Sequence, residues 1–165
     1  MMMISKNLAD AINAQVGREF GASFQYVQIA AYFESEALDG LAKLFYKQSD
    51  EERDHAMKLA HYVVETGAQL AIPAVEAPKV TFSSAEEAIQ AALNWETEVT
   101  RQINNLMDIA VAEKDYLARE FLDWFVVEQL EEVTSMEKLL RIAQRAGERN
   151  IIMLEAYLSH GGDED

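Results

Sequence analysis

The sequence predicts an all-α protein, a four-helix bundle with a short fifth helix at its C-terminal end. Half of the 165 residues are hydrophobic, whereas glycine (7) and proline (2) are scarce. Few helix breakers favour long helices over many short strands. Apolar residues also recur at spacings of three and four along four long segments. Both prolines fall between the second and third of these segments, so the helices divide into two pairs.

The first pair occupies the N-terminal part of the chain. One helix is expected from about Lys6 to Leu38, and it should end near Asp39-Gly40 because such a pair favours a turn. The next helix is expected from about Leu41 to Gly67, with Gly67 as the residue that follows its last turn. Because the connection between them is short, the two should form an antiparallel hairpin.

The second pair follows a connection of about fifteen residues, AQLAIPAVEAPKVTF, which has no helical period. A third helix should begin near Ser83-Ser84, where Glu86 or Glu87 three residues later resembles a capping box, and continue to about Lys114. A fourth is expected from about Tyr116 to Ala146. These two should form a second hairpin, and the long connection can then cross the length of the bundle.

The C-terminal end predicts a fifth helix over about residues 150–159, after Gly147 and before a polar tail, GGDED. It is too short to be stable alone, so its apolar residues suggest docking onto its own bundle or around a symmetry axis. We expect one domain over residues 1–165, with the bundle over about 6–146. The absence of cysteine excludes disulfides and thiolate metal sites. Any metal must therefore be bound by carboxylates, histidine and water.

The charge and the N-terminus limit the possible partners. A formal net charge of −15 argues against binding to nucleic acid or an anionic membrane and favours cations, although solubility alone also explains it. The N-terminal MMMISKNLAD lacks the features of a signal peptide, and no apolar run approaches the roughly 20 residues that span a bilayer. We expect a soluble, cytoplasmic protein.

Each long segment carries an acid in the middle of its apolar stripe. The acids are Glu19, Glu52, Glu96 and, in the fourth segment, Glu132 with Glu128 or Gln129 beside it. Each lies near or somewhat before the midpoint of its segment, so in an antiparallel bundle they can share one level. A buried carboxylate costs several kcal/mol, so four persist only if protonated, paired with bases or bound to cations.

Metal is the simplest of these neutralising partners. Arg18 and Arg53 neighbour the acids in sequence but lie about 100° away around the helix. In Glu52-Arg53-Asp54-His55, Glu and His are three residues apart and point the same way, so one ion can take a ligand from each. This motif alone is common, but with a mid-stripe Glu on every other helix it predicts a metal site. The alternatives are a buried polar network or a mistaken helix phase.

These segments resemble the ferritin family, and more closely the non-haem ferritins of bacteria, over essentially the whole chain. The resemblance lies in REFGASFQY, SDEERDHAMKLAHYV, WETEVT and LDWFVVEQLEEV. It implies a ferroxidase that oxidises iron(II) with O₂ or H₂O₂ at a di-iron site and stores the ferric mineral in a shell of 24 subunits. It also implies fifth helices at fourfold axes, and channels at threefold axes near Glu113, Asp115 or Glu120.

The resemblance implies a role for each candidate residue. Glu19, Glu52 and His55 would bind the first iron, with Glu52 bridging to a second iron on Glu96, with Gln129 or Glu132 close by. The fourth helix lacks the His of a second ExxH motif, so the second iron should be held more weakly. A third iron position would use Glu51, Glu128 and Glu131, which could equally be ordinary acidic surface. Tyr26 and Trp124 match aromatic positions beside the site, where they would supply an electron or orient a ligand, but they could equally be packing.

Haem is not expected, because Arg53 stands where the haem-binding ferritins have a ligating methionine. Three other functions remain as alternatives. One is a di-iron peroxidase of the rubrerythrin type, which the missing second ExxH and the absent cysteine-rich part argue against. Another is a DNA-protecting mini-ferritin, which would form a 12-mer and lack the fifth helix. The last is an interaction bundle with no metal, which would not change the rate of iron(II) oxidation.

Overall fold

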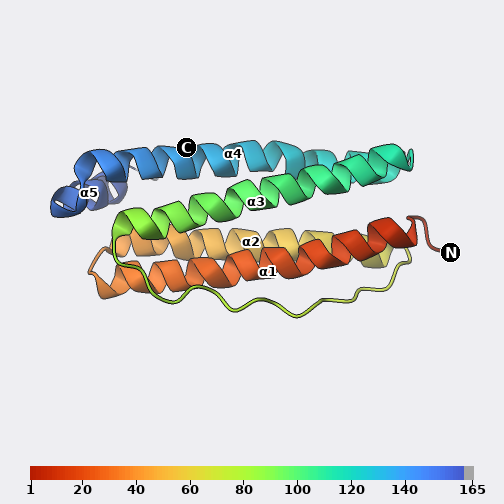
Figure 1. The fold of residues 1–165 in the computed structure, drawn as a ribbon, viewed down its shortest axis with the longest axis horizontal. Coiled ribbons are helices and arrows are strands. Elements are labelled where there is room, and N and C mark those ends of the chain that lie inside the picture. Colours follow the sequence, from red (N-terminus) through yellow and green to blue (C-terminus); the bar gives the residue numbers. More distant parts are fainter. Residues whose placement is uncertain (162–165) are drawn as a thin grey trace.

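A computed structural model describes residues 1–161, and these residues form the expected helical bundle. Its four long helices are α1 (Lys6–Ser35), α2 (Asp39–Glu65), α3 (Ala85–Ala112) and α4 (Tyr116–Ala146). They lie side by side with their long axes roughly aligned (Figure 1). A 3-10 turn, η1 (Glu148–Asn150), leads into α5 (Ile151–Gly161), which packs on α2 and α4 at one end of the bundle. The all-α fold class is confirmed, whereas the polar tail lies largely outside the described residues.

The helices pack as two hairpins, α1 with α2 and α3 with α4, and α1 also packs against α3. The connection over residues 66–84 runs along α1 from one end of the bundle to the other (Figure 1). The amide of Asn13 donates to Gln69 O (2.9 Å) and accepts from Ala71 N (3.1 Å). Gln25 makes the same pair of bonds with the backbone of Lys79. Two amide side chains of α1 thus hold the connection in place.

Gly17 of α1 allows this close approach of the connection, and Gly21 makes room for Trp95 of α3. A Cβ atom added at Gly17 would lie 2.6 Å from Cγ of Pro73, and one at Gly21 would lie 3.2 Å from the ring of Trp95. Both contacts are tighter than side chains normally tolerate, so only glycine fits without movement of the connection or the ring. The crossover predicted from its length is therefore also specified by residues on the helix that it crosses.

The ends of α1 and α3 follow the expected capping rules. Ser5 Oγ accepts a hydrogen bond from Leu8 N at 3.0 Å, and Ser84 Oγ accepts one from Glu87 N at 3.0 Å. The Glu87 carboxylate accepts from the backbone N–H of Ser83 at 2.7 Å, one residue before the cap. This is the predicted capping box in a shifted form.

The turn between α1 and α2 differs from the prediction. Helix α1 ends at Ser35, and Ala37 takes a left-handed conformation (φ 57°), so Asp39 and Gly40 already belong to α2. No side chain of the turn caps α2. Instead the carboxylate of Glu155 on α5 accepts from Gly40 N and, at 3.1 Å, from Leu41 N. The negative carboxylate lies where the helix dipole and unpaired N–H groups favour an anion.

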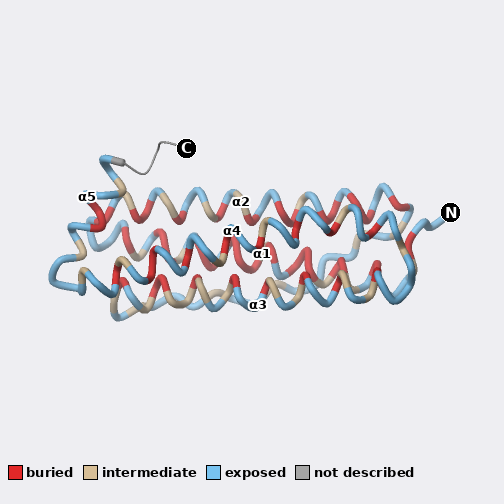
Figure 2. The backbone as a smooth tube through the Cα atoms, turned by 90° about the horizontal axis from the view of Figure 1, so that it is seen from above, coloured by how far each residue is buried: buried red, intermediate tan, exposed pale blue. Residues whose placement is uncertain are grey.

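The buried apolar side chains form two clusters, one toward each end of the bundle, and buried positions recur along all four long helices (Figure 2). On α1 the first cluster ends at Val16 and the second begins at Tyr26. On α4 the corresponding residues are Phe125 and Met136. A polar layer therefore divides the core at one level on every helix. No helix within residues 1–161 is long and apolar enough to cross a membrane.

Candidate metal centre

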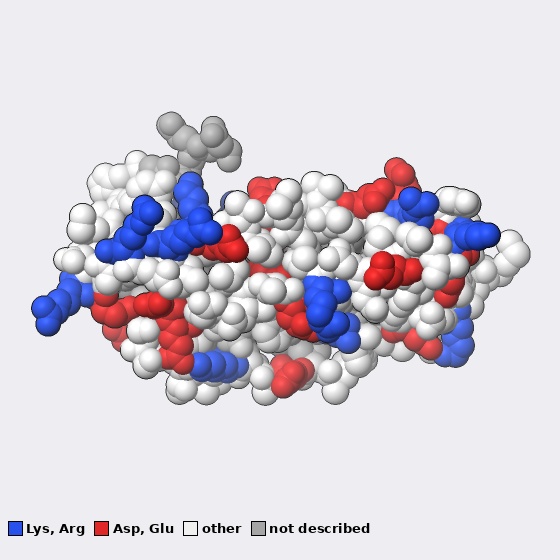
Figure 3. Space-filling view, turned by 45° about the horizontal axis from the view of Figure 1, so that its top comes forward, with Lys and Arg blue, Asp and Glu red and all other residues white. Residues whose placement is uncertain are grey.

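The polar layer holds all six candidate iron ligands, and each of these residues is at most 5% exposed. Every long helix contributes to it: Glu19 from α1, Glu52 and His55 from α2, Glu96 from α3, Gln129 and Glu132 from α4. Acidic side chains are also common on the surface, where they are interspersed with basic ones (Figure 3). The candidate centre is therefore distinguished by burial rather than by charge alone.

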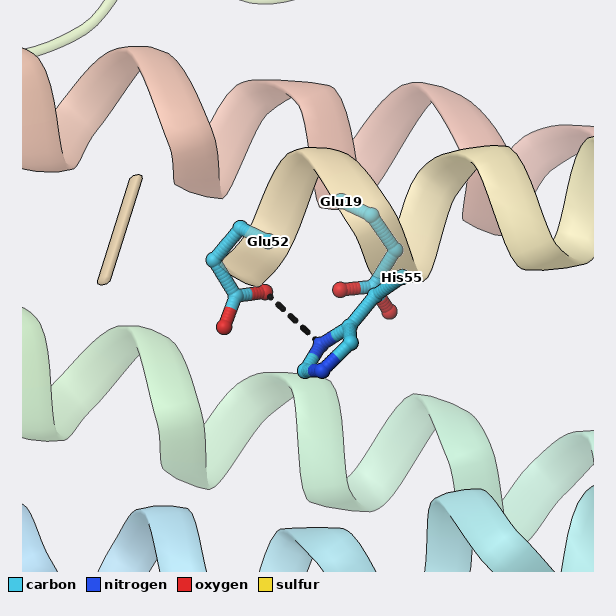
Figure 4. Close-up of side chains that lie close together, drawn as sticks. All are labelled: Glu19, Glu52 and His55. Atoms are coloured by element: carbon cyan, nitrogen blue, oxygen red, sulfur yellow. Dashed lines mark ion pairs between the residues drawn. The ribbon is translucent and has the colours of Figure 1, made fainter. Parts of the chain in front are cut away.

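The ligand atoms fall into two overlapping groups. Glu19, Glu52 and His55 each offer an atom within 4.8 Å of the others, and Glu52, Glu96 and Glu132 do the same. Figure 4 shows the first group: Glu19 reaches from α1 toward the two side chains of α2, and His55 Nδ1 lies 3.5 Å from Glu52 Oε2. Because Glu52 belongs to both groups, its two oxygens can serve two ions at once.

Most of these ligand atoms have no hydrogen-bond partner. Among the described residues, the buried atoms without one include Glu19 Oε2, both carboxylate oxygens of Glu52, Glu96 Oε2 and His55 Nδ1. Buried polar atoms in folded proteins nearly always have hydrogen-bond partners. Five buried atoms without one in a single layer therefore indicate that a bound group supplies the missing partner. Oxygen and imidazole donors in this number suit a divalent metal ion of the first transition row.

Basic side chains do not take this place. In the part of the chain that the structure describes, none of the ion pairs made by lysine or arginine reaches the four buried glutamates. Arg53 is exposed, with Asp54 3.9 Å away. Arg18 is also exposed, and its guanidinium donates to Gln15 at 3.4 Å rather than to Glu19.

The pKa values of the glutamates reflect this isolation. Burial raises the pKa of Glu19 well above its ordinary value, and the neighbouring Glu52 raises it further. Burial and the charge of Glu96 likewise raise the pKa of Glu52. Burial raises the pKa of Glu96 to about 7 against the opposing hydrogen bond from Tyr26, and raises that of Glu132 to about 8 with Glu96 adding to it. A cation would reverse these shifts because it stabilises the charged carboxylates.

Hydrogen bonds from neighbouring side chains orient three of the candidate ligands. Gln15 Nε2 donates to Glu19 Oε1 at 2.7 Å and leaves Oε2 of that carboxylate free. The Tyr26 hydroxyl donates to Glu96 Oε1, and Thr100 Oγ1 lies 2.9 Å from Gln129 Oε1. Gln15 and Thr100 were not predicted from the sequence. Each lies one helical turn from a mid-stripe glutamate, but this position alone does not distinguish them from other polar residues on a helix.

The two aromatic candidates occupy different environments. The ring of Tyr26 is buried within the apolar core beside Phe45, and its hydroxyl reaches into the polar layer. Trp124 is 39% exposed, and its ring meets that of His55 edge to face, with 5.3 Å between centroids. The ammonium of Lys58 lies 3.3 Å from the centre of the Trp124 ring, a cation–π contact that the sequence did not predict.

The acids proposed for a third iron lie on a groove of about 830 Å³ between α2, α4 and α5. Glu128 Oε1 is 3.9 Å from His55 Nε2, and these two residues with Glu132 offer atoms within 4.8 Å of one another. Glu51 is half-buried, with Gln48 donating to it at 2.8 Å. Glu131 is exposed on the groove wall. The groove therefore connects the buried layer to the surface.

Comparisons with known proteins agree with this arrangement. The sequence profile of the ferritin-like domain family matches residues 9–146. A bacterial non-heme ferritin of Staphylococcus aureus is 41% identical over 146 residues, 88% of each chain. Ferritin BfrB of Mycobacterium tuberculosis is 42% identical over 149 residues, covering 90% of this chain and 82% of that protein.

Solved structures agree as well. An open pore ferritin from the hyperthermophilic archaeon Archaeoglobus fulgidus superimposes with a TM-score of 0.92 at 33% sequence identity. The match covers 97% of this chain and 99% of the archaeal one, so it includes all five helices and the long connection. From its sequence, its fold and its buried carboxylate layer, this chain belongs to the ferritin family.

Proposed function

We propose that this chain is a subunit of an iron-storing ferritin and that its polar layer is a ferroxidase centre for two iron(II) ions. The five buried ligand atoms without a hydrogen-bond partner carry the proposal, because no lysine or arginine ion pair of the described chain reaches the glutamates among them. The family membership supports iron as the metal and oxidation as the reaction. Iron is here the substrate and the cargo.

The ligand groups suggest one position for each ion. The first would be held by Glu19, Glu52 and His55, and the second by Glu52, Glu96 and Glu132 with the amide of Gln129 nearby. Glu52 would bridge the two. Because the second position has no imidazole, we expect it to bind iron(II) more weakly and to release the iron(III) product more readily.

Two adjacent ions suit the redox chemistry. Each iron(II) gives one electron, so a pair reduces O₂ with two protons to H₂O₂, or H₂O₂ with two protons to two water molecules. Neither reaction releases a one-electron oxygen radical. Tyr26 would hold Glu96 in place, and Trp124 would orient His55 or supply a further electron from its position beside the imidazole.

Storage requires a route out of the centre and a container. The groove beside Glu51, Glu128 and Glu131 offers acidic groups along which the product can leave the buried layer. We propose a shell of 24 copies in the cytoplasm as the container, with no haem, nucleic acid or membrane partner. A single ferritin-like domain with α5 and one ligand set within one bundle favours this shell over a 12-subunit mini-ferritin.

Replacement of the bridging carboxylate tests the proposal. Glu52→Ala removes ligands from both positions, so rapid iron(II) oxidation, followed by the absorbance of iron(III), should fall to about the rate without protein, while the particle size stays unchanged. Glu137→Gln on the exposed face of α4 is the control and should match the parent. A Glu52→Ala protein that oxidises iron(II) at the parental rate would falsify the assignment.

A further inference from the structure

One contact in the polar layer is inconsistent with the hydrogen-bonding capacity of the groups that form it. Thr100 Oγ1 lies 2.8 Å from the backbone oxygen of Glu96 and 2.9 Å from Oε1 of Gln129. Both of these oxygens accept hydrogen bonds and cannot donate. A threonine hydroxyl has a single proton but two lone pairs, so it cannot donate fully to both oxygens at once.

The conflict disappears when the Gln129 amide turns by half a rotation. Thr100 then donates to Glu96 O, one turn earlier on the same helix, which is a common bond for helical threonine. The turned amide places its NH₂ group where Oε1 had been, and donates to Thr100 Oγ1. The Thr100 hydroxyl then donates one hydrogen bond and accepts one, and both of its contacts are satisfied.

The other end of the amide lies against Glu96. In the unturned orientation Oε1 of Gln129 lies on Thr100, so the end of the amide that can reach Glu96 is its NH₂ group, and Gln129 is among the side chains that partly offset the raised pKa of Glu96. After the turn, Oε1 takes this place. An oxygen facing an ionised carboxylate is repelled, whereas an oxygen facing a cation bound to Glu96 and Glu132 is attracted to it. The preferred orientation therefore depends on whether the second position is filled.

We propose that Thr100 is a positioning residue that allows Gln129 to turn its oxygen toward the second metal ion. Its hydroxyl donates to Gln129 when the position is empty and accepts from Gln129 when it is filled. The inference rests on the proposed function, because it requires an ion at Glu96 and Glu132. Gln129 is already one of the six candidate ligands, and the inference adds Thr100 as the residue that controls the orientation of its amide.

Binding of Zn²⁺, which cannot be oxidised, tests this without turnover. Titration calorimetry on chelator-treated protein should show two Zn²⁺ per buried centre in the parent, and Glu96→Gln identifies the step that belongs to the second position. Thr100→Val keeps the shape of the side chain but removes the hydroxyl. It should weaken the second step about tenfold and leave the first unchanged. Thr100→Ser should restore the parental value.

The same Thr100→Val substitution in a Gln129→Glu protein separates an effect on the orientation of residue 129 from an effect on packing. In Gln129→Glu both ends of the side chain are oxygens, so its orientation no longer matters. Thr100→Val should then change the second step by no more than about twofold. Equal losses in both backgrounds would show that the hydroxyl acts only structurally, and this would overturn the inference.

The remaining outcomes distinguish the two proposals. A parent that binds two Zn²⁺ while Thr100→Val leaves both steps unchanged overturns the role of Thr100 and leaves the metal centre standing. A Thr100→Ser variant as weak as Thr100→Val does the same, because it retains the hydroxyl. A parent with no Zn²⁺ among the buried glutamates overturns the metal centre itself, and the role of Thr100 with it.

Discussion

Each buried carboxyl group in the polar layer lowers the stability of the metal-free protein, but it is also a candidate ligand for a cation. In a protein without bound metal, a buried glutamate must either keep its proton or carry a charge that nothing nearby balances. Glu132, with a pKa of about 8, keeps its proton at neutral pH. Glu96, with a pKa of about 7, is divided between the two forms. Iron binding must displace these protons, so uptake should release acid into the solution.

This predicts how the stability of the metal-free protein depends on pH. The folded-state pKa of Glu132 lies above its ordinary value of 4.5, so the folded form binds more protons than the unfolded form between the two values. The stabilisation is therefore complete below about pH 4.5 and is lost as the pH rises through about 8. Urea unfolding of chelator-treated protein at one concentration should show a loss of about 1 kcal/mol or more over this range.

Glu132→Gln provides the matched comparison, because the amide keeps the shape of the side chain but does not ionise. Its free energy of unfolding should fall less steeply between about pH 5 and about pH 8 than that of the parent. Saturating Zn²⁺ should also flatten the parental curve, since the ion favours the charged carboxylates. Identical slopes for parent and variant would show that Glu132 does not titrate in this way.

The sequence was sufficient to predict which buried acids the structure brings together as candidate ligands, but not the residues that orient them. Glu19, Glu52 and Glu96 were recognisable because an acid within an apolar stripe breaks the pattern. Gln15 and Thr100 are neutral, and neutral polar residues are common on helices. Their role depends on which atom of a neighbour they meet, and that follows from the packing of helices distant in sequence.

At the level of helices, α5 contributes to the fold through Glu155. Its carboxylate supplies the anion and the two acceptors that the N-terminal turn of α2 lacks. The sequence predicted α5 and its docking but not this contact, because Glu155 and Gly40 are 115 residues apart. The expected turn at Asp39-Gly40 was misplaced for a related reason. Tertiary contacts, rather than the local Asp-Gly signal, determine where α2 begins.

Replacement of this cap should loosen both helices. Glu155→Ala should lower the stability by about 1 kcal/mol, which is typical for the loss of a helix cap, and should increase hydrogen exchange at Gly40 and Leu41. Glu155→Gln should lie between parent and alanine variant, because the amide keeps one acceptor but loses the charge. Parental exchange rates in Glu155→Ala would show that the carboxylate does not cap α2.

The crossing of the long connection makes a separate prediction. Gly17→Ala places a Cβ atom 2.6 Å from Pro73 Cγ, so the proline or the helix must move. We expect a loss of about 1–3 kcal/mol in the free energy of unfolding, as for other overpacked sites. Pro73→Ala in the same chain removes the clashing atoms and should recover most of the loss. A lack of recovery would place the strain elsewhere.

For the whole molecule, the exposed apolar residues indicate surfaces that an assembly would cover. Phe24 and Val27 are 47% and 42% exposed on α1, and Ile72 and Val80 are exposed on the connection that lies along it. The connection runs along α1 (Figure 1), so these four exposed apolar residues lie on two neighbouring segments, and together they are called the apolar strip. Such exposed apolar strips often mark contacts between proteins, and here they are consistent with the proposed shell.

Phe24→Glu should therefore disrupt assembly without unfolding the subunit. A charge buried against a second copy without a partner costs several kcal/mol, so sedimentation should show smaller particles while the circular dichroism keeps its helical form. Lys6→Glu, at an exposed position outside the strip, is the control and should leave the particle size unchanged. If Phe24→Glu sediments like the parent, α1 does not form the contact.

The division of the ligands between the two hairpins has a consequence for biosynthesis. Glu19, Glu52 and His55 all lie on the α1–α2 hairpin, within the first 55 residues. The first hairpin therefore contains all three candidate ligands of the proposed first position and is translated before α3. If the proposed centre holds iron, this hairpin can bind one ion without the second, and that ion would already neutralise Glu52 when Glu96 and Glu132 pack against it.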